Sequence, residues 1–187
     1  MLKLNVIVAS TRPGRKGPAV ARWIDGYART HGAFEPVFVD LAEVGLPMFD
    51  EAKHPAMRQY EHEHTKRWSA IVGAADAFAF VTPEYNFVPP PSLVNALDFL
   101  VHEWGFKPAG IVSYGGVSGG LRAAQALKLQ LTALRMMPIP EGVPIPNFAS
   151  HIREDGAFHS NEMIDTSAKT MLDALHRWAT ALKPARG

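Results

Sequence analysis

The fold of this chain is decided in its opening stretch, residues 2–18, which reads LKLNVIVASTRPGRKGP. The apolar, β-branched run Leu2–Ala9 has the length and composition of a buried strand. Hydroxyl, guanidinium and glycine residues follow directly, and an amphipathic segment begins after them. In this strand–loop–helix order, the helix N-terminus offers unpaired backbone N–H groups and a partial positive charge. The stretch therefore predicts a site for a phosphorylated cofactor.

The predicted phosphate site carries neither of the two common glycine signatures. The dinucleotide pattern Gly-x-Gly-x-x-Gly and the Walker pattern ending in Gly-Lys-Ser/Thr are both absent. Ser10, Thr11 and Arg12 instead favour a terminal phosphate, held by hydroxyls, backbone N–H groups and a guanidinium fork. The alternative is that the prolines and glycines of the loop only form a turn, with Arg12 in solvent.

Length and composition indicate one globular domain over residues 1–187, with 47% hydrophobic and 20% charged residues. A net charge of +1 favours neither nucleic acid nor a membrane as partner. The chain has no cysteine, which excludes disulfides, cysteine-bound metals and the thiolate nucleophile of a tyrosine phosphatase. No apolar run is long enough to span a bilayer and no export signal is evident, so we expect a cytoplasmic protein.

Short apolar segments alternate with amphipathic ones along the whole chain. The apolar segments predict five buried parallel strands: Leu2–Ala9, Pro36–Asp40, Ala77–Thr82, Gly110–Tyr114 and Met136–Pro140. The amphipathic segments predict helices: Ala19–Thr30, Pro55–Ala75, Ser92–His102, Leu121–Arg135 and Glu162–Leu182. This alternation predicts an α/β fold, with a parallel sheet between two helical layers. Right-handed crossovers favour the strand order 2-1-3-4-5.

This strand order brings three loops to one crevice. In an open parallel sheet, ligands bind beyond the carboxyl ends of the strands where the order reverses, here between the first and third strands. Residues 10–18, 82–91 and 113–120 follow the first, third and fourth strands. The second loop offers an aromatic face and amide groups, and the glycines of the third let the backbone approach a flat ligand. A phosphate pocket beside a flat ring pocket matches FMN, although each loop alone favours a simple turn or helix start.

Four motifs carry a resemblance to a known family, and their order and spacing cover most of the chain. They are Ser10-x-Arg12, Pro83-Glu84-Tyr85-Asn86, Asn95-Ala96-Leu97-Asp98, and Ser113-Tyr114-Gly115-Gly116 with Gly119-Gly120. In these motifs the chain resembles the NAD(P)H-dependent FMN reductase family. That family has a flavodoxin-like three-layer fold and includes quinone, chromate and azo-dye reductases. The chain departs from the family pattern at Ala9, Pro13 and Pro18, and at Phe87, whose ring would narrow access to the flavin.

The resemblance implies which residues bind FMN. The phosphate would be held by Ser10, Arg12 and the backbone of Pro18, Ala19 and Val20. The isoalloxazine ring would be lined by Pro83, Glu84, Tyr85 and Asn86, largely through main-chain groups and the Asn86 side chain. The other edge of the ring would be flanked by Ser113, Gly115, Gly116 and Val117. Hydride transfer from NADPH or NADH needs no protein acid or base, so no catalytic side chain is predicted.

The sequence therefore predicts an FMN-dependent oxidoreductase that uses NAD(P)H to reduce a quinone, a flavin, an azo dye or a metal oxyanion. One alternative is a non-enzymatic FMN-binding electron carrier, although such carriers are usually strongly acidic. Another is a cofactor-free regulatory module of the same fold. We also expect a homodimer or homotetramer. This prediction takes Trp104 and Phe106 as surface residues and uses the long loop at residues 141–157 as a further contact surface.

Two further groups of charged or histidine residues have competing interpretations. The densest histidine cluster is Glu61-His62-Glu63-His64. Residues two apart on a helix point away from each other, so we expect a solvated face and no metal site. Arg15 and Lys16 either bind the 2′-phosphate of NADP or lie in solvent.

Overall fold

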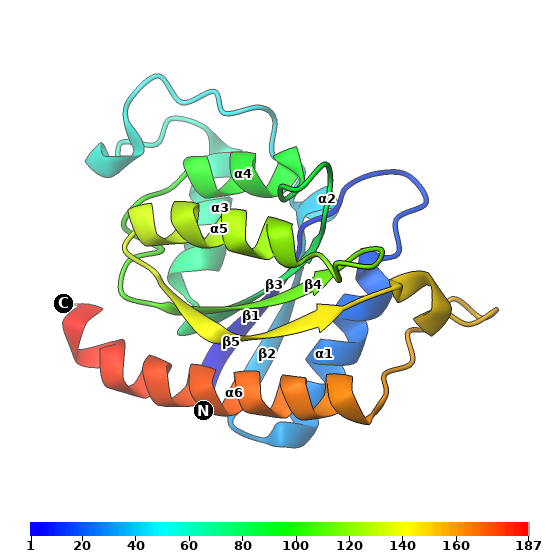
Figure 1. Ribbon diagram of the computed structural model, residues 1–187. Coiled ribbons are helices and arrows are strands. Elements are labelled where there is room, and N and C mark those ends of the chain that lie inside the picture. The colour runs from blue at the N-terminus through cyan, green and yellow to red at the C-terminus, as the bar shows by residue number, and fades with distance from the viewer. Residues whose placement is uncertain (187) are drawn as a thin grey trace.

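Five parallel strands form the centre of the molecule, in the order β2-β1-β3-β4-β5 (Figure 1). The structure is a computed structural model and describes residues 1–186. The strands are β1 (Leu2–Val8), β2 (Phe34–Asp40), β3 (Ala77–Pro83), β4 (Pro108–Tyr114) and β5 (Met137–Ile145). All four strand pairs are parallel. The predicted α/β fold and strand order are confirmed.

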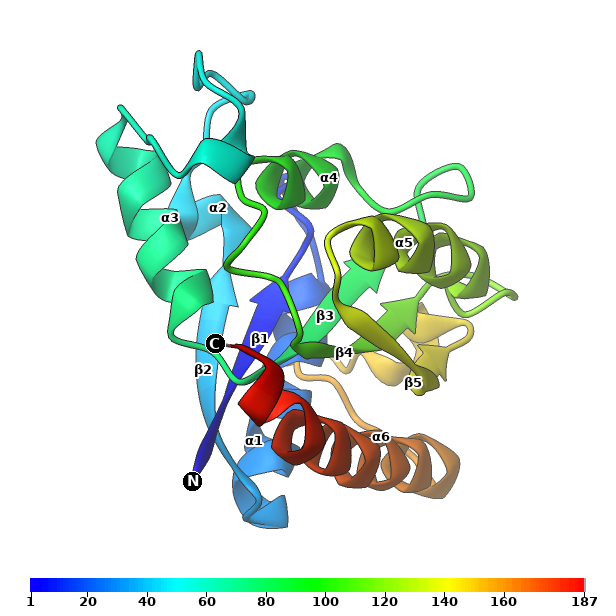
Figure 2. The ribbon, with the colours of Figure 1, turned by 90° about the vertical axis from the view of Figure 1, so that its left-hand side faces the viewer.

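Helices cover both faces of this sheet, which gives three layers (Figures 1 and 2). One face carries α1 (Gly17–His31) and α6 (Glu162–Leu182). The other carries α3 (Glu63–Gly73), α4 (Pro91–Asp98) and α5 (Leu121–Ala133). Short elements complete the chain: α2 (Leu41–Val44) and the 3-10 turns Pro55–Met57, Phe148–His151 and Lys183–Arg186. Within residues 1–186, none of the helices combines the length and apolar character needed to cross a membrane.

The central strands are apolar on both sides because each side packs against a helical layer. Successive side chains of a strand point to opposite faces. Ala79 and Val81 of β3 accordingly belong to the core under α1 and α6. Phe78 and Phe80 belong to the core under α3, α4 and α5. A continuous hydrophobic run is therefore the correct signature of these strands.

The predicted helix Pro55–Ala75 is wrong in its first part, because α3 begins only at Glu63. Residues 55–57 form a 3-10 turn, which ends at Arg58 with a φ of +53°. The buried carboxylate of Glu51 then accepts hydrogen bonds from the N–H groups of Glu61 (2.9 Å) and His62 (3.1 Å). These side-chain bonds from outside the segment hold it as a loop, in place of the helical hydrogen bonds that its sequence also allows.

Two further boundaries differ from the prediction by more than two residues, and one surface assignment differs as well. The helix predicted over Ser92–His102 ends at Asp98, and β5 continues beyond Pro140 to Ile145, so the long loop begins later than residue 141. Trp104 is fully buried, and its Nε1–H donates to the Leu97 carbonyl (3.2 Å). Its indole packs among the aromatic rings of Trp68, Phe78 and Phe80, so placing it on the surface was wrong.

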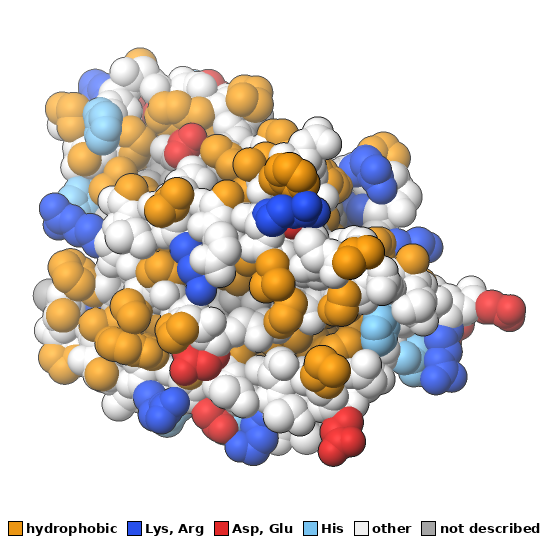
Figure 3. All heavy atoms as spheres, viewed as in Figure 1, with side chains coloured by type: hydrophobic (Ala, Val, Ile, Leu, Met, Phe, Trp, Pro, Cys, Tyr) orange, Lys and Arg blue, Asp and Glu red, His pale blue; other side chains and the backbone are white. Residues whose placement is uncertain are grey.

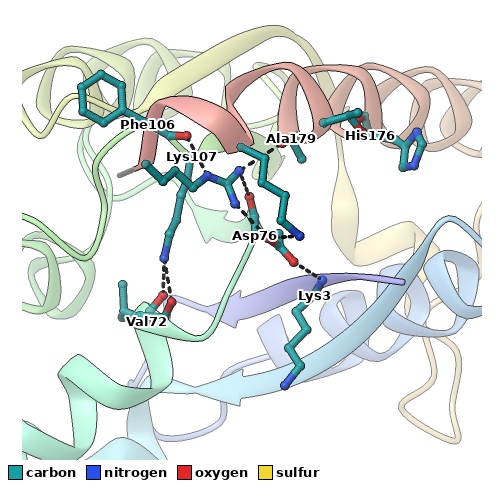
Figure 4. Close-up of polar contacts among 11 residues, drawn as sticks. Lys3, Val72, Asp76, Phe106, Lys107, His176 and Ala179 are labelled. Atoms are coloured by element: carbon teal, nitrogen blue, oxygen red, sulfur yellow. Dashed lines mark hydrogen bonds and ion pairs between the residues drawn. The ribbon is translucent and has the colours of Figure 1, made fainter.

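The C-terminal segment is tied to the edge of the sheet where the strands begin (Figure 4). Asp76, just before β3, accepts hydrogen bonds from the Lys3 backbone N–H (2.9 Å) and from the Arg186 guanidinium (2.8 Å). Arg186 also donates to the carbonyls of Asp76, Phe106 and Ala179. One guanidinium therefore joins the starts of β3 and β4 to the end of α6.

Lys107 at the same edge is buried, and its ammonium group donates to the Val72 and Gly73 carbonyls at the end of α3 (2.9 and 3.0 Å). Burial lowers the pKa of Lys107 to about 8. The native protein then binds this proton less tightly than the unfolded chain, where lysine titrates near pH 10.4. The free energy of unfolding of the wild-type protein, measured against that of Lys107→Met, should therefore rise by about 2–3 kcal/mol between pH 8 and 10.5. Urea denaturation at stepped pH measures the difference, and parallel pH profiles for the two proteins would contradict the prediction.

Candidate functional site

Three loops meet at the carboxyl edge of the sheet and contact one another there. The first follows β1, the second follows β3 and the third follows β4. The Tyr114 hydroxyl at the end of β4 donates to Ser10 Oγ in the first loop (3.3 Å). The Arg12 guanidinium lies 5.9 Å from the centre of the Tyr85 ring in the second loop. Ser118 of the third loop donates to the Glu84 carboxylate (3.2 Å). The loops form one continuous rim.

The first loop presents several hydrogen-bond donors that have no acceptor among residues 1–186. Ser10 is buried, while Thr11 and Arg12 are exposed. The hydrogen bonds and ion pairs formed within residues 1–186 use neither the Arg12 guanidinium nor the N–H groups of Ser10, Thr11 and Gly17. Unpaired N–H groups at a helix N-terminus beside a guanidinium form a site suited to an anion. This donor set fits the phosphate of FMN.

The start of α1 offers fewer backbone donors than the family resemblance implies. Pro18 has no N–H group, and the Ala19 N–H donates to the Lys16 carbonyl (3.0 Å). Lys16 at the N-cap makes no side-chain capping bond. Phosphate binding at Pro18, Ala19 and Val20 stays a prediction, and Val20, the fourth residue of α1, is fully buried.

Arg15 is an anchor of the first loop. Its guanidinium donates two hydrogen bonds to the Asp40 carboxylate (2.7 and 2.8 Å) and a third to the Ser10 carbonyl (2.9 Å). Asp40 is 5% exposed and also caps α2 by accepting from the Ala42 N–H (3.0 Å). Free solvation, one of the two interpretations offered for Arg15, is therefore wrong, while binding of the NADP 2′-phosphate stays a prediction.

The second loop is a tight hairpin turn. Tyr85 and Val88 exchange two backbone hydrogen bonds (2.9 and 3.1 Å), and the two residues between them have positive φ angles, +49° for Asn86 and +74° for Phe87. These features are typical of a type I′ turn, which suits asparagine but strains a bulky residue such as phenylalanine. The Asn86 amide, exposed at the tip, makes no hydrogen bond within the described residues and is free for a ligand.

Glu84 joins the second loop to the start of α5. Its carboxylate pairs with the Arg122 guanidinium (Nε–Oε1, 2.7 Å) and accepts from the Arg122 N–H (3.1 Å). The bonds from Arg122 hold the pKa of Glu84 below its ordinary value. The Arg122 guanidinium also lies 3.9 Å from the centre of the Phe87 ring, which is 60% exposed. Phe87 is thus held against α5, and Arg122 is a site residue that the sequence motifs did not reveal.

The third loop is shaped by close backbone approaches. Ser113 is buried, and its hydroxyl donates to the Gly119 carbonyl (2.8 Å), so this side chain closes the loop. A Cβ at Gly120, whose φ is +78°, would lie 2.8 Å from the Tyr114 nitrogen. The N–H groups of Gly116 and Val117 take part in no hydrogen bond within the described residues, and Val117 is 90% exposed. These two N–H groups are available to a ring edge.

A cavity of about 440 Å³ adjoins the first loop on the side of α2 and α4. Thr11, Ser92 and Asn95 are its polar lining residues. The Asn95 side chain accepts from the Phe49 N–H (2.9 Å) and donates to the Pro47 carbonyl (2.7 Å), which fixes the loop that follows α2. Ser92 donates to the Ala9 carbonyl (2.6 Å) and links α4 to the end of β1.

The histidine cluster differs from its prediction in one respect. His62 lies before α3, at its N-cap, so its ring stacks on that of His64 at 5.1 Å with an interplanar angle of 9°. The expectation that the two rings diverge was wrong because it assumed a helix that included both. His64 also contacts Asp50 (3.0 Å). Within residues 1–186, no group of three or more histidine and acidic side chains is placed to hold a metal ion.

Comparison with known proteins agrees with this geometry. The chain is 44% identical to an NAD(P)H-dependent FMN reductase of Schizosaccharomyces pombe over 140 residues, 74% of this chain and 70% of the relative. It is 33% identical to a quinone reductase of Pseudomonas putida over 148 residues, 73% of this chain and 74% of the relative. A flavoenzyme NAD(P)H:acceptor oxidoreductase of Paracoccus denitrificans shares the fold, with a TM-score of 0.74, 24% identity and coverage of 97% and 98%. The family model described as NADPH-dependent FMN reductase matches residues 2–150, and the chain belongs to that family.

Proposed function

We propose that this flavin-dependent oxidoreductase of the FMN reductase family transfers hydride from NADPH or NADH, by way of FMN, to a quinone. Free flavin, azo dyes and metal oxyanions are the further acceptors to assay. Bound FMN supplies the two-electron chemistry that links the nicotinamide to the acceptor. The observation that carries the proposal is the donor set of the first loop, where backbone N–H groups and the Arg12 guanidinium have no acceptor within residues 1–186.

The protein's own groups would bind and orient the cofactor, with no side chain as acid or base. The phosphate side consists of Ser10, Arg12 and the start of α1 at Pro18, Ala19 and Val20. The ring side consists of Pro83, Glu84, Tyr85, Asn86, Ser113, Gly115, Gly116 and Val117. Backbone N–H groups at Gly116 and Val117 would stabilise negative charge that develops at the ring edge. Glu84 and Ser113 would contribute only through their main chain, since both side chains are bonded to the protein.

The direct test is to purify the protein, titrate it with FMN, and follow NADPH oxidation with and without a quinone. We expect binding of one FMN and quinone-dependent turnover. A bound flavin that NAD(P)H does not reduce would favour the electron carrier. Protein that takes up no FMN would favour the cofactor-free module.

Arg12 provides a residue-level test of the phosphate site. Replacing Arg12 with alanine should raise the Kd for FMN about 10- to 150-fold, because a charge-assisted bond contributes about 1.5–3 kcal/mol. The Kd for riboflavin, which has no phosphate, and the Tm should stay unchanged, because Arg12 is exposed and forms no ion pair within the described residues. Arg22→Ala, an exposed arginine on α1, is the matched control. An equal effect on both flavins would contradict the assignment.

We further propose that the protein forms a homodimer or homotetramer. Several large apolar side chains are exposed, among them Met48 (77%) after α2, Leu129 (78%) on α5 and Met163 (75%) on α6. Figure 3 shows hydrophobic side chains across the face that carries α5, β5 and α6. Phe106, two residues before β4, is 41% exposed. Light scattering coupled to size exclusion should give a mass that is a multiple of the monomer, and a monomer at micromolar concentration would overturn this proposal.

A further inference from the structure

Tyr114 connects two of the three loops through its hydroxyl group. The residue lies at the end of β4, while its hydroxyl contacts Ser10 Oγ after β1 at 3.3 Å. β3 lies between these two strands, so the contact crosses two strand spacings, about 9–10 Å of sheet. Only a long side chain can make such a link, and a tyrosine places a polar group at its far end.

The phenol of Tyr114 is held in one position by its surroundings. The residue is 3% exposed, and its ring packs against Phe148 with ring centres 5.1 Å apart. Gly17 closes the site from α1: a Cβ there would lie 2.6 Å from the Tyr114 hydroxyl and 2.5 Å from Ser10 Oγ. The contact with Ser10 is therefore built into the packing of β4 and α1, and little further ordering is needed when a ligand arrives.

Ser10 is fixed at two of its atoms and free at two others. Its carbonyl accepts from the Arg15 guanidinium (2.9 Å), and its Oγ accepts from Tyr114. Burial raises the pKa of Tyr114 to about 12, so the phenol keeps its proton at neutral pH and can donate it to Ser10 Oγ. The backbone N–H and the hydroxyl proton of Ser10 have no acceptor within residues 1–186. Both donors belong to the first loop, as Arg12 does.

We propose that Tyr114 is a positioning residue for the cofactor phosphate: it donates to Ser10 Oγ and so directs the Ser10 hydroxyl proton to a phosphate oxygen. Because a hydroxyl has one proton and two lone pairs, a bond accepted from Tyr114 leaves that proton for the ligand. Tyr114 itself does not touch the phosphate. This inference rests on the proposed binding of FMN at the first loop. It assigns the positioning role to the hydrogen bond between the Tyr114 hydroxyl and Ser10 Oγ.

The test compares FMN with riboflavin, which differ only in the phosphate. Binding of each is measured by quenching of flavin fluorescence for wild type, Tyr114→Phe, Ser10→Ala and the double variant. We expect Tyr114→Phe to raise the Kd for FMN about 5- to 10-fold and leave the Kd for riboflavin unchanged. The double variant should bind FMN no more weakly than Ser10→Ala, because the tyrosine acts only through that serine. Tyr27→Phe, a half-buried tyrosine on α1 away from the loops, is the matched control and should bind both flavins as wild type does.

Three other results would contradict the positioning role of Tyr114, and a fourth would contradict FMN binding itself. Equal weakening of both flavins by Tyr114→Phe would show an effect on the ring pocket or on folding and would overturn the positioning role. Additive losses of FMN affinity in the double variant would also overturn the positioning role, because they would require a contact of Tyr114 with FMN that is independent of Ser10. Unchanged FMN binding by Tyr114→Phe, with normal binding by wild type, would overturn this inference alone. Wild-type protein that binds neither flavin would overturn the proposed function as well.

Discussion

Replacing Arg15 with alanine is expected to lower the free energy of unfolding by about 2–4 kcal/mol. Its partner, the Asp40 carboxylate, is 4% exposed and receives two hydrogen bonds from this guanidinium. Without Arg15 that carboxylate stays buried with a single bond from the Ala42 N–H. An unpaired buried charge is far more costly than the loss of an exposed ion pair. Urea denaturation at neutral pH measures the change.

The matched control for Arg15 is an ion pair of the same kind on the surface. Lys66 and Glu63 contact at 2.7 Å on α3, with side chains 48% and 76% exposed. Lys66→Ala should leave the free energy of unfolding nearly unchanged, because solvent screens this exposed ion pair. Arg15→Lys should fall between wild type and Arg15→Ala, because lysine keeps the charge but loses the two-pronged geometry. Equal effects of Arg15→Ala and Lys66→Ala would show that the Asp40 carboxylate is solvated.

The sequence predicted the fold well because the fold depends on local signals. The continuous apolar runs at Ala77–Pro83 and Pro108–Tyr114 are strands buried on both faces, and composition alone identifies such strands. Helix periodicity likewise located α1 and α6. Strand order then followed from the handedness of the crossovers, which leaves few topologies. The same strand order also predicted the position of the crevice at the carboxyl edge.

The errors arise where long-range contacts decide the structure. The sequence of residues 55–62 predicts a helix, yet hydrogen bonds to the Glu51 carboxylate hold residues 61 and 62 in a loop. Trp104 lies outside a periodic segment, and only the packing of three other aromatic rings shows that it is buried. Tyr114 belongs to a motif that was noted, but its link to Ser10 crosses 104 residues of chain. Arg122 lies in no motif, and only its contacts with Glu84 and Phe87 show that it belongs to the site.

The Gly17→Ala substitution should have the largest effect on cofactor binding of any single methyl addition in α1. The new Cβ would lie 2.5 Å from Ser10 Oγ and 2.6 Å from the Tyr114 hydroxyl, closer than packed atoms allow. Overpacking of this kind costs about 1–3 kcal/mol, so either the start of α1 or the first loop must move. Because the Ser10 donors are proposed to bind the phosphate, we expect the Kd for FMN to rise about 10- to 100-fold.

Gly26→Ala separates this effect from a general effect of alanine in α1. Gly26 lies in the same helix, and a Cβ there meets nothing within 4 Å. Alanine also has the higher helix propensity, so this variant should gain about 0.5–1 kcal/mol in free energy of unfolding and bind FMN as wild type does. The same substitution is therefore expected to have opposite effects at the two glycines. At Gly17 the neighbouring atoms leave no room for a Cβ, whereas at Gly26 they do. If Gly17→Ala bound FMN with the wild-type Kd, the first loop would not need its present geometry, and the phosphate would have to be held by groups other than Ser10.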